Sequence, residues 1–213
     1  MSAVELELRV AWQRHVGSSP AAAEWFDAVL AHHREAGRQY HDERHVGWVV
    51  RHVTEIAERV PVDDLDATVA AAFFHDAVYD PQRDDNEAAS ARLAVRVLGD
   101  VGWDEQRVRR VSELVLATAE HDVEAADRDT RVLLAADLAV LASEPARYAD
   151  YATAVRREYA HVDDAAWRAG RSAVLRRLLD RPRLFASDLG LESWESRARA
   201  NMAAELASLT SGG

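Results

Sequence analysis

Four side chains that could ligate a metal interrupt apolar helical stretches. His75 and Asp76 directly follow the run VAAAFF, His45 begins an amphipathic stretch, and Asp137 lies within VLLAADLAVL. An ionisable side chain in such surroundings costs free energy unless it is paired or bound to a metal. Two imidazoles and two carboxylates suit a divalent Mn, Fe, Co, Ni, Zn or Mg ion. The sequence therefore predicts a metal centre made by these four residues, with a buried histidine–carboxylate hydrogen bond as the structural alternative.

The elements that would position these residues are all helical. Ala, Leu, Arg and Glu dominate, and only nine Gly and five Pro are scattered along the chain, which favours helix over strand. The helix from Asp64 through the apolar stretch 69–74 is hydrophobic on every side, so we expect it to be the central, most buried one. The predicted helices cover about residues 3–15, 20–37, 45–60, 64–76, 86–98, 104–121, 129–143, 145–160, 163–180 and 191–208.

These helices predict one all-α, single-domain bundle over residues 1–213. Neither an internal repeat nor a long linker divides the chain, and 48% of its residues are apolar, enough for a substantial core. The metal site would lie in a central part at about 40–145, with flanking helices at 1–37 and 145–208.

Composition excludes several classes of protein. The 26 basic residues, all Arg, against 37 acidic ones give a net charge of −11, which argues against a general nucleic-acid binder. The absence of Cys removes disulfides and thiolate metal sites, and the absence of Lys removes Schiff-base chemistry. No apolar run approaches a membrane span, and the start MSAVELELRV does not resemble a leader peptide. We expect a cytoplasmic protein without a membrane or nucleic-acid partner; the oligomeric state cannot be inferred.

The order His45, His75–Asp76, Asp137 resembles the HD-domain superfamily of metal-dependent phosphohydrolases. The stretches YHDERHV, FFHDAVYDPQRDDNE, LLAADLAVL and YATAVRREYAHV are also similar to a bacterial subgroup of predicted HD phosphohydrolases. The resemblance to the superfamily covers about residues 40–145. It implies a helical bundle of the HD type with one divalent metal, in which a metal-activated water hydrolyses a phosphoester or phosphoanhydride bond. The substrate would be a nucleotide or another small phosphorylated metabolite.

The same resemblance suggests two catalytic carboxylates. In related guanosine tetraphosphate hydrolases, the HD pair is followed by two residues and then Glu-Asp; here Tyr79 replaces that Glu, whereas Asp80 keeps the Asp. Asp80 and Glu87 are the candidates for orienting or deprotonating the water, or for protonating the leaving oxygen. The alternative is that the acidic residues of this loop are solvated charges and helix caps.

Four further residues are candidates for binding the substrate. Arg83 and Arg44 could hold phosphate oxygens, Arg83 in the loop after the HD pair and Arg44 beside His45. His41 could line the pocket. His121 could contact the substrate or a ligand residue; it could also bind a second metal, but dinuclear relatives use two extra histidines and only one is present, which favours a single metal.

Two other functions compete with hydrolysis of a phosphate ester. His41 and His45, at i and i+4, resemble the HExxH zinc-protease motif, but position 42 is Asp instead of the general-base Glu. The chain could also be a non-catalytic metal- or ligand-binding HD regulatory module. The presence of all four predicted ligands argues against a degenerate module.

Overall fold

Helices make up the described chain, as the composition predicts. The computed structural model describes residues 1–211, and no strand occurs among them. The α-helices are α1 (Ala3–His15), α2 (Pro20–His32), α3 (Glu43–Ala57), α4 (Leu65–Phe74), α5 (Asn86–Val101), α6 (Glu105–Ala117), α7 (Arg128–Asp137), α8 (Pro145–Glu158), α9 (Asp164–Leu179) and α10 (Glu192–Ser211). Two short 3₁₀ helices, η1 (Leu138–Ala142) and η2 (Ser187–Leu189), complete the set. The all-α prediction is confirmed, and residues 212–213 of the predicted domain lie outside the described ones.

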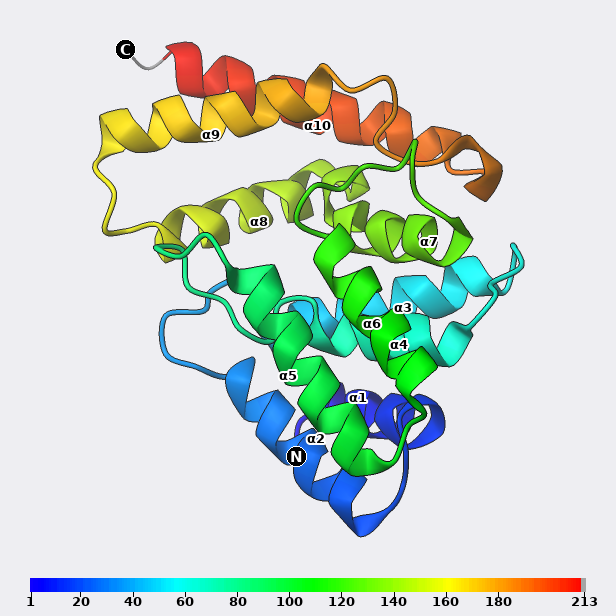
Figure 1. Ribbon diagram of the computed structural model, residues 1–213. Coiled ribbons are helices and arrows are strands. Elements are labelled where there is room, and N and C mark those ends of the chain that lie inside the picture. The colour runs from blue at the N-terminus through cyan, green and yellow to red at the C-terminus, as the bar shows by residue number, and fades with distance from the viewer. Residues whose placement is uncertain (212–213) are drawn as a thin grey trace.

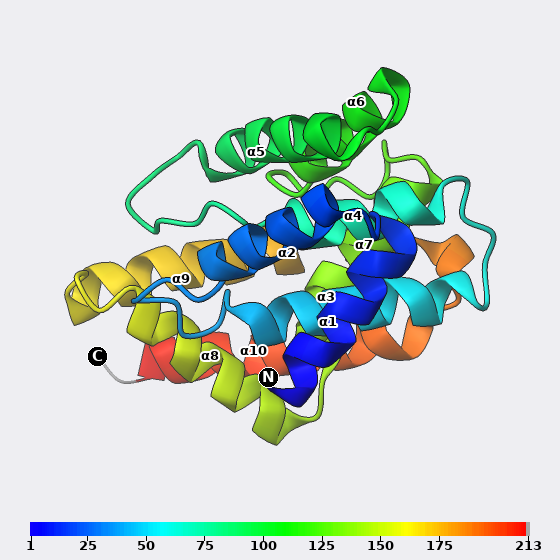
Figure 2. The same ribbon diagram turned by 90° about the horizontal axis from the view of Figure 1, so that it is seen from below.

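The helices are arranged around α3, α4 and α7, which pack on one another. Figure 1 shows α9 and α10 side by side at one end of the molecule and α1 and α2 at the other, with α3, α4 and α7 between them. The view from below in Figure 2 shows α5 and α6 together along one side. No helix in residues 1–211 is long and apolar enough to cross a membrane.

Helix α4 is the most buried element, as predicted. Asp64 caps its start by accepting a hydrogen bond from the backbone N–H of Ala67 at 2.9 Å. Every residue from Ala67 to Phe74 is buried. A helix that is apolar all round must be covered on all sides, and α1, α3, α5, α6 and α7 all contact α4. The C-terminal end of α4 is therefore held deep in the protein.

Helices α2 and α6 are among those that end earlier than their sequence patterns predict. Helix α2 ends at His32 rather than near Gly37, and Gly37 lies in turns with a φ of 106°, a conformation that favours glycine. Helix α6 ends at Ala117 rather than at 121, and His121 takes up a left-handed φ of 50°. The loops that follow these two helices therefore place His41 and His121 near the predicted ligands.

Trp12 ties α1 to the centre of the bundle. Its side chain is 1% exposed, packs edge-on against Phe26 and Phe73, and donates from Nε1 to the carbonyl of Ala22 at 2.9 Å. The indole thus connects α1 and α2 to α4.

We expect Trp12→Ala to lower the free energy of unfolding by about 3–5 kcal/mol, because it opens a cavity in the core and removes the hydrogen bond that joins α1 to α2. Leu6→Ala, on the exposed side of the same helix, should change it by no more than about 0.5 kcal/mol. Urea unfolding followed by circular dichroism measures both. Equal losses in the two variants would contradict this role of Trp12.

Candidate metal centre

His45 projects from the first turn of α3 into the core. Asp42 caps this helix by accepting a hydrogen bond from the backbone N–H of Arg44 at 2.8 Å. The side chain of His45 is 1% exposed. Its Nε2 faces His75, whereas its buried Nδ1 has no hydrogen-bond partner among the described residues.

His75 and Asp76 stand where α4 ends. The backbone N–H of His75 closes the helix on Ala71 at 2.9 Å, and its ring Nδ1 donates to the carbonyl of Ala72 at 2.9 Å. Because a carbonyl only accepts, the proton of a neutral His75 lies on Nδ1, and the Nε2 lone pair is free for a ligand.

Asp137 is the last residue of α7. The predicted helix over 129–143 is not continuous: α7 changes at Asp137 to the 3₁₀ helix η1, Leu138–Ala142. Asp137 directs one carboxylate oxygen toward the two imidazoles and the other to His121, whose Nε2 lies 2.8 Å away. The sequence predicts that His121 contacts a ligand residue or the substrate. In the structure His121 contacts Asp137.

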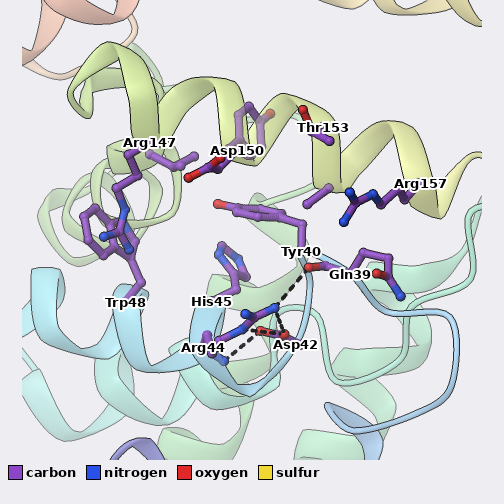
Figure 3. A pocket seen from close by; sticks show the side chains of 13 residues that line it. Gln39, Tyr40, Asp42, Arg44, His45, Trp48, Arg147, Asp150, Thr153 and Arg157 are labelled. Carbon is purple, nitrogen blue, oxygen red and sulfur yellow. Dashed lines mark hydrogen bonds and ion pairs between the residues drawn. The ribbon is translucent and has the colours of Figure 1, made fainter.

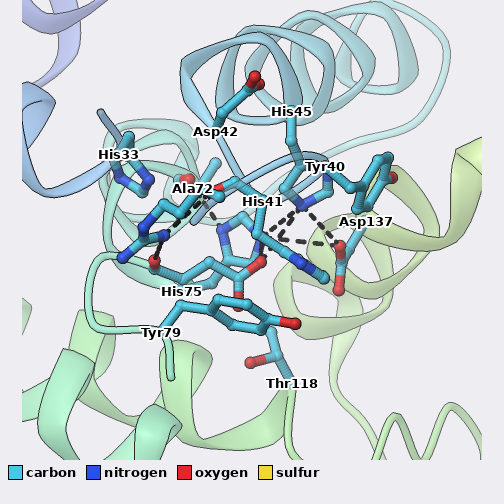
Figure 4. A network of polar contacts seen from close by, with 12 residues as sticks. His33, Tyr40, His41, Asp42, His45, Ala72, His75, Tyr79, Thr118 and Asp137 are labelled. Carbon is cyan, nitrogen blue, oxygen red and sulfur yellow. Dashed lines mark hydrogen bonds and ion pairs between the residues drawn. The ribbon is translucent and has the colours of Figure 1, made fainter. Parts of the chain in front are cut away.

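The donor atoms of this group are spaced as ligands of one ion would be. His45 Nε2 lies 3.0 Å from His75 Nε2 and 3.3 Å from Asp137 Oδ1, and His75 Nε2 lies 3.6 Å from that oxygen (Figure 4). Ligands about 2.1 Å from a common centre are about 3.0 Å apart in an octahedron and about 3.4 Å apart in a tetrahedron. The three residues could therefore hold a metal ion.

Asp76 lies beside the same group. Its Oδ2 is 3.1 Å from His75 Nε2 and 3.4 Å from His45 Nε2. Burial alone would raise the pKa of Asp76, but the charge of His75 and the hydrogen bonds from both imidazoles hold this pKa well below its usual range. Asp76, the fourth predicted ligand, thus lies beside both imidazoles, whereas the donor atoms that all lie close to one another are those of His45, His75 and Asp137.

The electrostatics of the centre favour positive charge. Burial would lower the pKa of His75, but Asp76 and Asp137 raise it well above the usual range. The pKa of His45 is raised in the same way, again against its burial. The pKa of Asp137 is held well below its usual value, chiefly by the hydrogen bond from His121, although burial opposes this. Two carboxylates that stay ionised in the core can hold a cation.

A polar cavity of about 360 Å³ opens beside the ligands. Asp76 and Asp137 contribute to its wall, so a small molecule in the cavity would reach the metal centre. Four further lining residues are ones that the sequence singles out as site candidates: His41, Arg83, Glu87 and His121. The rest of the lining is made by two tyrosines, two short polar residues and a threonine: Tyr79, Tyr159, Asp84, Asn86 and Thr118. In Figure 4 the rings of His41 and Tyr79 and the hydroxyl of Thr118 lie around the ligand group.

His41 does not share a helix with His45, because α3 begins only at Glu43. Its Nδ1 lies 2.7 Å from Oε2 of Glu158, and its ring stacks on Tyr79 at a centroid distance of 4.1 Å. The arrangement that a zinc protease needs, with two histidines on one helical face, is therefore not formed.

Two buried charged residues that the sequence does not single out hold the chain before α3. Arg38 is 9% exposed and donates to the carbonyls of His41, Asp76 and Ala77 at 2.7–3.0 Å. Glu158, at the end of α8, accepts hydrogen bonds from the same loop. In the sequence both residues look like exposed charges, because each binds groups that are distant along the chain.

The structure does not support a catalytic position for Asp80. Its side chain is on the surface, accepts a hydrogen bond from the backbone N–H of Gln82 at 2.9 Å, and is not among the residues lining the cavity. A short acidic side chain in a loop forms such turns readily. Glu87, half-buried at the start of α5, does line the cavity and remains a candidate.

The two predicted phosphate-binding arginines lie in different places. Arg83 lines the cavity beside the ligands and pairs with Asp85 at 2.6 Å. Arg44 points away from that cavity, pairs with Asp42, and lines a second cavity of about 480 Å³ between the start of α3 and α8. Figure 3 shows this second cavity, whose lining also includes Tyr40 and His45. Arg44 is therefore not positioned to contact a ligand in the first cavity.

Comparison with models of known protein families, with curated proteins and with solved structures finds no match for this chain.

Glu158 should make stability depend on pH. Burial would raise its pKa, but hydrogen bonds from His41 and from the backbone of Tyr40 and His41 outweigh burial and lower the pKa from 4.5 to about 2. A pKa that is lower in the folded state stabilises the fold above about pH 4.5, and this stabilisation is lost as the pH falls toward 2.

Glu158→Gln should therefore lower the free energy of unfolding at pH 7 by about 1–3 kcal/mol, and the difference from the wild type should shrink by pH 3. Urea unfolding at pH 7, 5 and 3 measures this. Glu105→Gln, whose side chain is 96% exposed, is the control and should follow the wild type. A loss in Glu158→Gln that is the same at pH 3 as at pH 7 would contradict the assignment.

Proposed function

We propose that this protein is a metal-dependent phosphohydrolase related to the HD superfamily. It would cleave a phosphoester or phosphoanhydride bond of a nucleotide or another small phosphorylated metabolite. The observation that carries the proposal is that two imidazole nitrogens and an oxygen of Asp137 lie 3.0–3.6 Å from one another, beside a cavity that is also lined by an arginine and two further histidines. The order of these ligands along the chain matches the superfamily that the sequence resembles.

His45, His75 and Asp137 would hold the ion, and Asp76 lies close enough to join them. A divalent Mn, Fe, Co, Ni, Zn or Mg ion there would lower the pKa of a coordinated water and polarise a phosphoryl oxygen. The donor set, two imidazoles with carboxylates, is compatible with each of these ions.

The remaining polar groups of the cavity suit a phosphate ester. Arg83 can donate two parallel hydrogen bonds to phosphate oxygens once it turns from Asp85, its partner on the protein surface. Glu87 can take a proton from the attacking water or return one to the leaving oxygen. His121, fixed by Asp137, borders the place where the phosphate would lie.

Removal of one ligand should abolish metal binding. His75→Ala deletes an imidazole of the candidate centre, and we expect the purified variant to lose its stoichiometric divalent metal, measured by elemental analysis after reloading and desalting. His161→Ala, on an exposed histidine, should bind as the wild type does. Asp137→Asn tests the same centre with a smaller change in volume, and full metal content in both ligand variants would show that the ion binds elsewhere.

A screen of phosphomonoesters, nucleoside triphosphates and cyclic nucleotides with each metal restored should find chelator-sensitive hydrolysis. On the substrate found, Arg83→Ala should raise KM about tenfold with a smaller effect on kcat, because it removes binding energy common to ground and transition states. Arg92→Ala is the matched control: Arg92 also pairs with Asp85 but does not line the cavity.

A negative screen with fully metal-loaded protein would favour the non-catalytic regulatory module over the hydrolase. An unchanged KM in Arg83→Ala would instead remove Arg83 from the substrate site and leave hydrolysis itself unaffected.

A further inference from the structure

The carboxylate of Glu158 is completely buried and forms five hydrogen bonds with residues next to the candidate centre. Its Oε1 accepts from three successive backbone N–H groups, those of Gln39, Tyr40 and His41, at 2.8, 2.8 and 3.0 Å. Its Oε2 lies 2.7 Å from His41 Nδ1 and accepts from the hydroxyl of Tyr79 at 3.1 Å. One side chain from the end of α8 therefore fixes both the backbone and the ring of His41.

This contact determines which edge of the His41 ring can meet a ligand. An ionised carboxylate accepts hydrogen bonds and cannot donate them, so the ring nitrogen that faces Glu158 must carry a proton. In the neutral imidazole that leaves the lone pair on Nε2. Stacking on Tyr79, with 28° between the ring planes, prevents the ring from turning over freely.

The rest of His41 faces the candidate site. Its side chain is 20% exposed and lines the same cavity as Asp76 and Asp137. Its ring also lies edge-on to that of His45, at a centroid distance of 5.6 Å. A hydrogen-bond acceptor held there is within the space that a water and a phosphate ester would share.

We propose that Glu158 is a positioning residue: by binding Nδ1–H of His41 it presents Nε2 to the cavity, where this nitrogen accepts a hydrogen bond from the attacking water and orients it. The role of the water rests on the proposed hydrolytic function. The fixed tautomer of His41 does not, and it can be measured without a substrate or a metal.

A purely structural Glu158 would only anchor the loop at 39–41. Glu158→Gln separates the two roles, because the amide oxygen can still accept from the backbone N–H groups, whereas the amide NH₂ can replace the oxygen that His41 faces. An NH₂ group donates, so the proton of His41 should move to Nε2. Tyr79→Phe is the matched control, since it removes another hydrogen bond to Oε2 and leaves the Nδ1 contact in place.

The test is ¹⁵N NMR of the imidazole nitrogens of the full-length, metal-free protein at pH 8.5, above the ordinary range of histidine titration. The His41 signals are assigned by their loss in His41→Gln. We expect protonated Nδ1 in the wild type and in Tyr79→Phe, and protonated Nε2 in Glu158→Gln. A wild-type His41 with its proton on Nε2 overturns the proposal even where Glu158→Gln does not fold. An unchanged tautomer in a folded Glu158→Gln also overturns it.

Kinetics on a substrate from the screen distinguish failure of this proposal from failure of the proposed function. Glu158→Gln should keep its metal and its KM but lose kcat about 10²-fold, since the acceptor toward the water is lost, and Glu158→Asp should restore part of it. Normal kcat in a variant with a reversed tautomer would refute the orienting role while hydrolysis stands. A wild type that hydrolyses nothing, with the tautomer as expected, would refute hydrolysis and the role of the water but leave the contact.

Discussion

The cost of placing ionisable groups inside an apolar bundle is the constraint on which the rest of this structure depends. Two imidazoles and two carboxylates meet where α3, α4 and α7 pack together, and the two histidines are almost wholly buried. Isolated charges in such a place would be strongly destabilising. Together they compensate one another: the carboxylates raise the pKa of each imidazole, and the imidazoles help to lower the pKa of each carboxyl. The same mutual dependence makes the group a good cage for a divalent cation.

These four groups lie together because each of them stands at or next to the end of a helix. His75 and Asp76 follow a helix whose apolar surface is covered on all sides, Asp137 ends α7, and His45 lies in the first turn of α3. Around them, Arg38 and Glu158 satisfy the polar groups of the chain that leads into α3. The inner group, the four predicted ligands, is thus supported by an outer group, Arg38 and Glu158, which are themselves buried charges. Such outer contacts keep the geometry of the ligands fixed.

The inner group could be predicted from sequence because each member interrupts a locally apolar pattern. The outer one could not: Glu158 lies 117 residues from His41, and beside Arg156 and Arg157 it looks like an ordinary surface charge. Long-range partners leave no trace in local periodicity. Sequence alone also offers Asp80 beside Glu87, but a loop carboxylate next to a motif can bond its own backbone, as Asp80 does. Helix caps and apolar spacing predict the helical class and most helix starts. They do not predict the ends of α2, α6 and α7, because the backbone turns at those ends are selected by tertiary contacts.

X-ray absorption spectroscopy of the full-length protein loaded with one equivalent of Zn²⁺ tests the central claim most directly. The shell of atoms around the ion reports ligand type independently of any activity. If His45, His75 and Asp137 hold the ion, the spectrum will show two imidazoles completed by oxygen ligands, and the imidazole scattering will fall to that of one ring or vanish in His75→Ala. A shell of oxygen atoms alone in the wild-type protein would contradict the account.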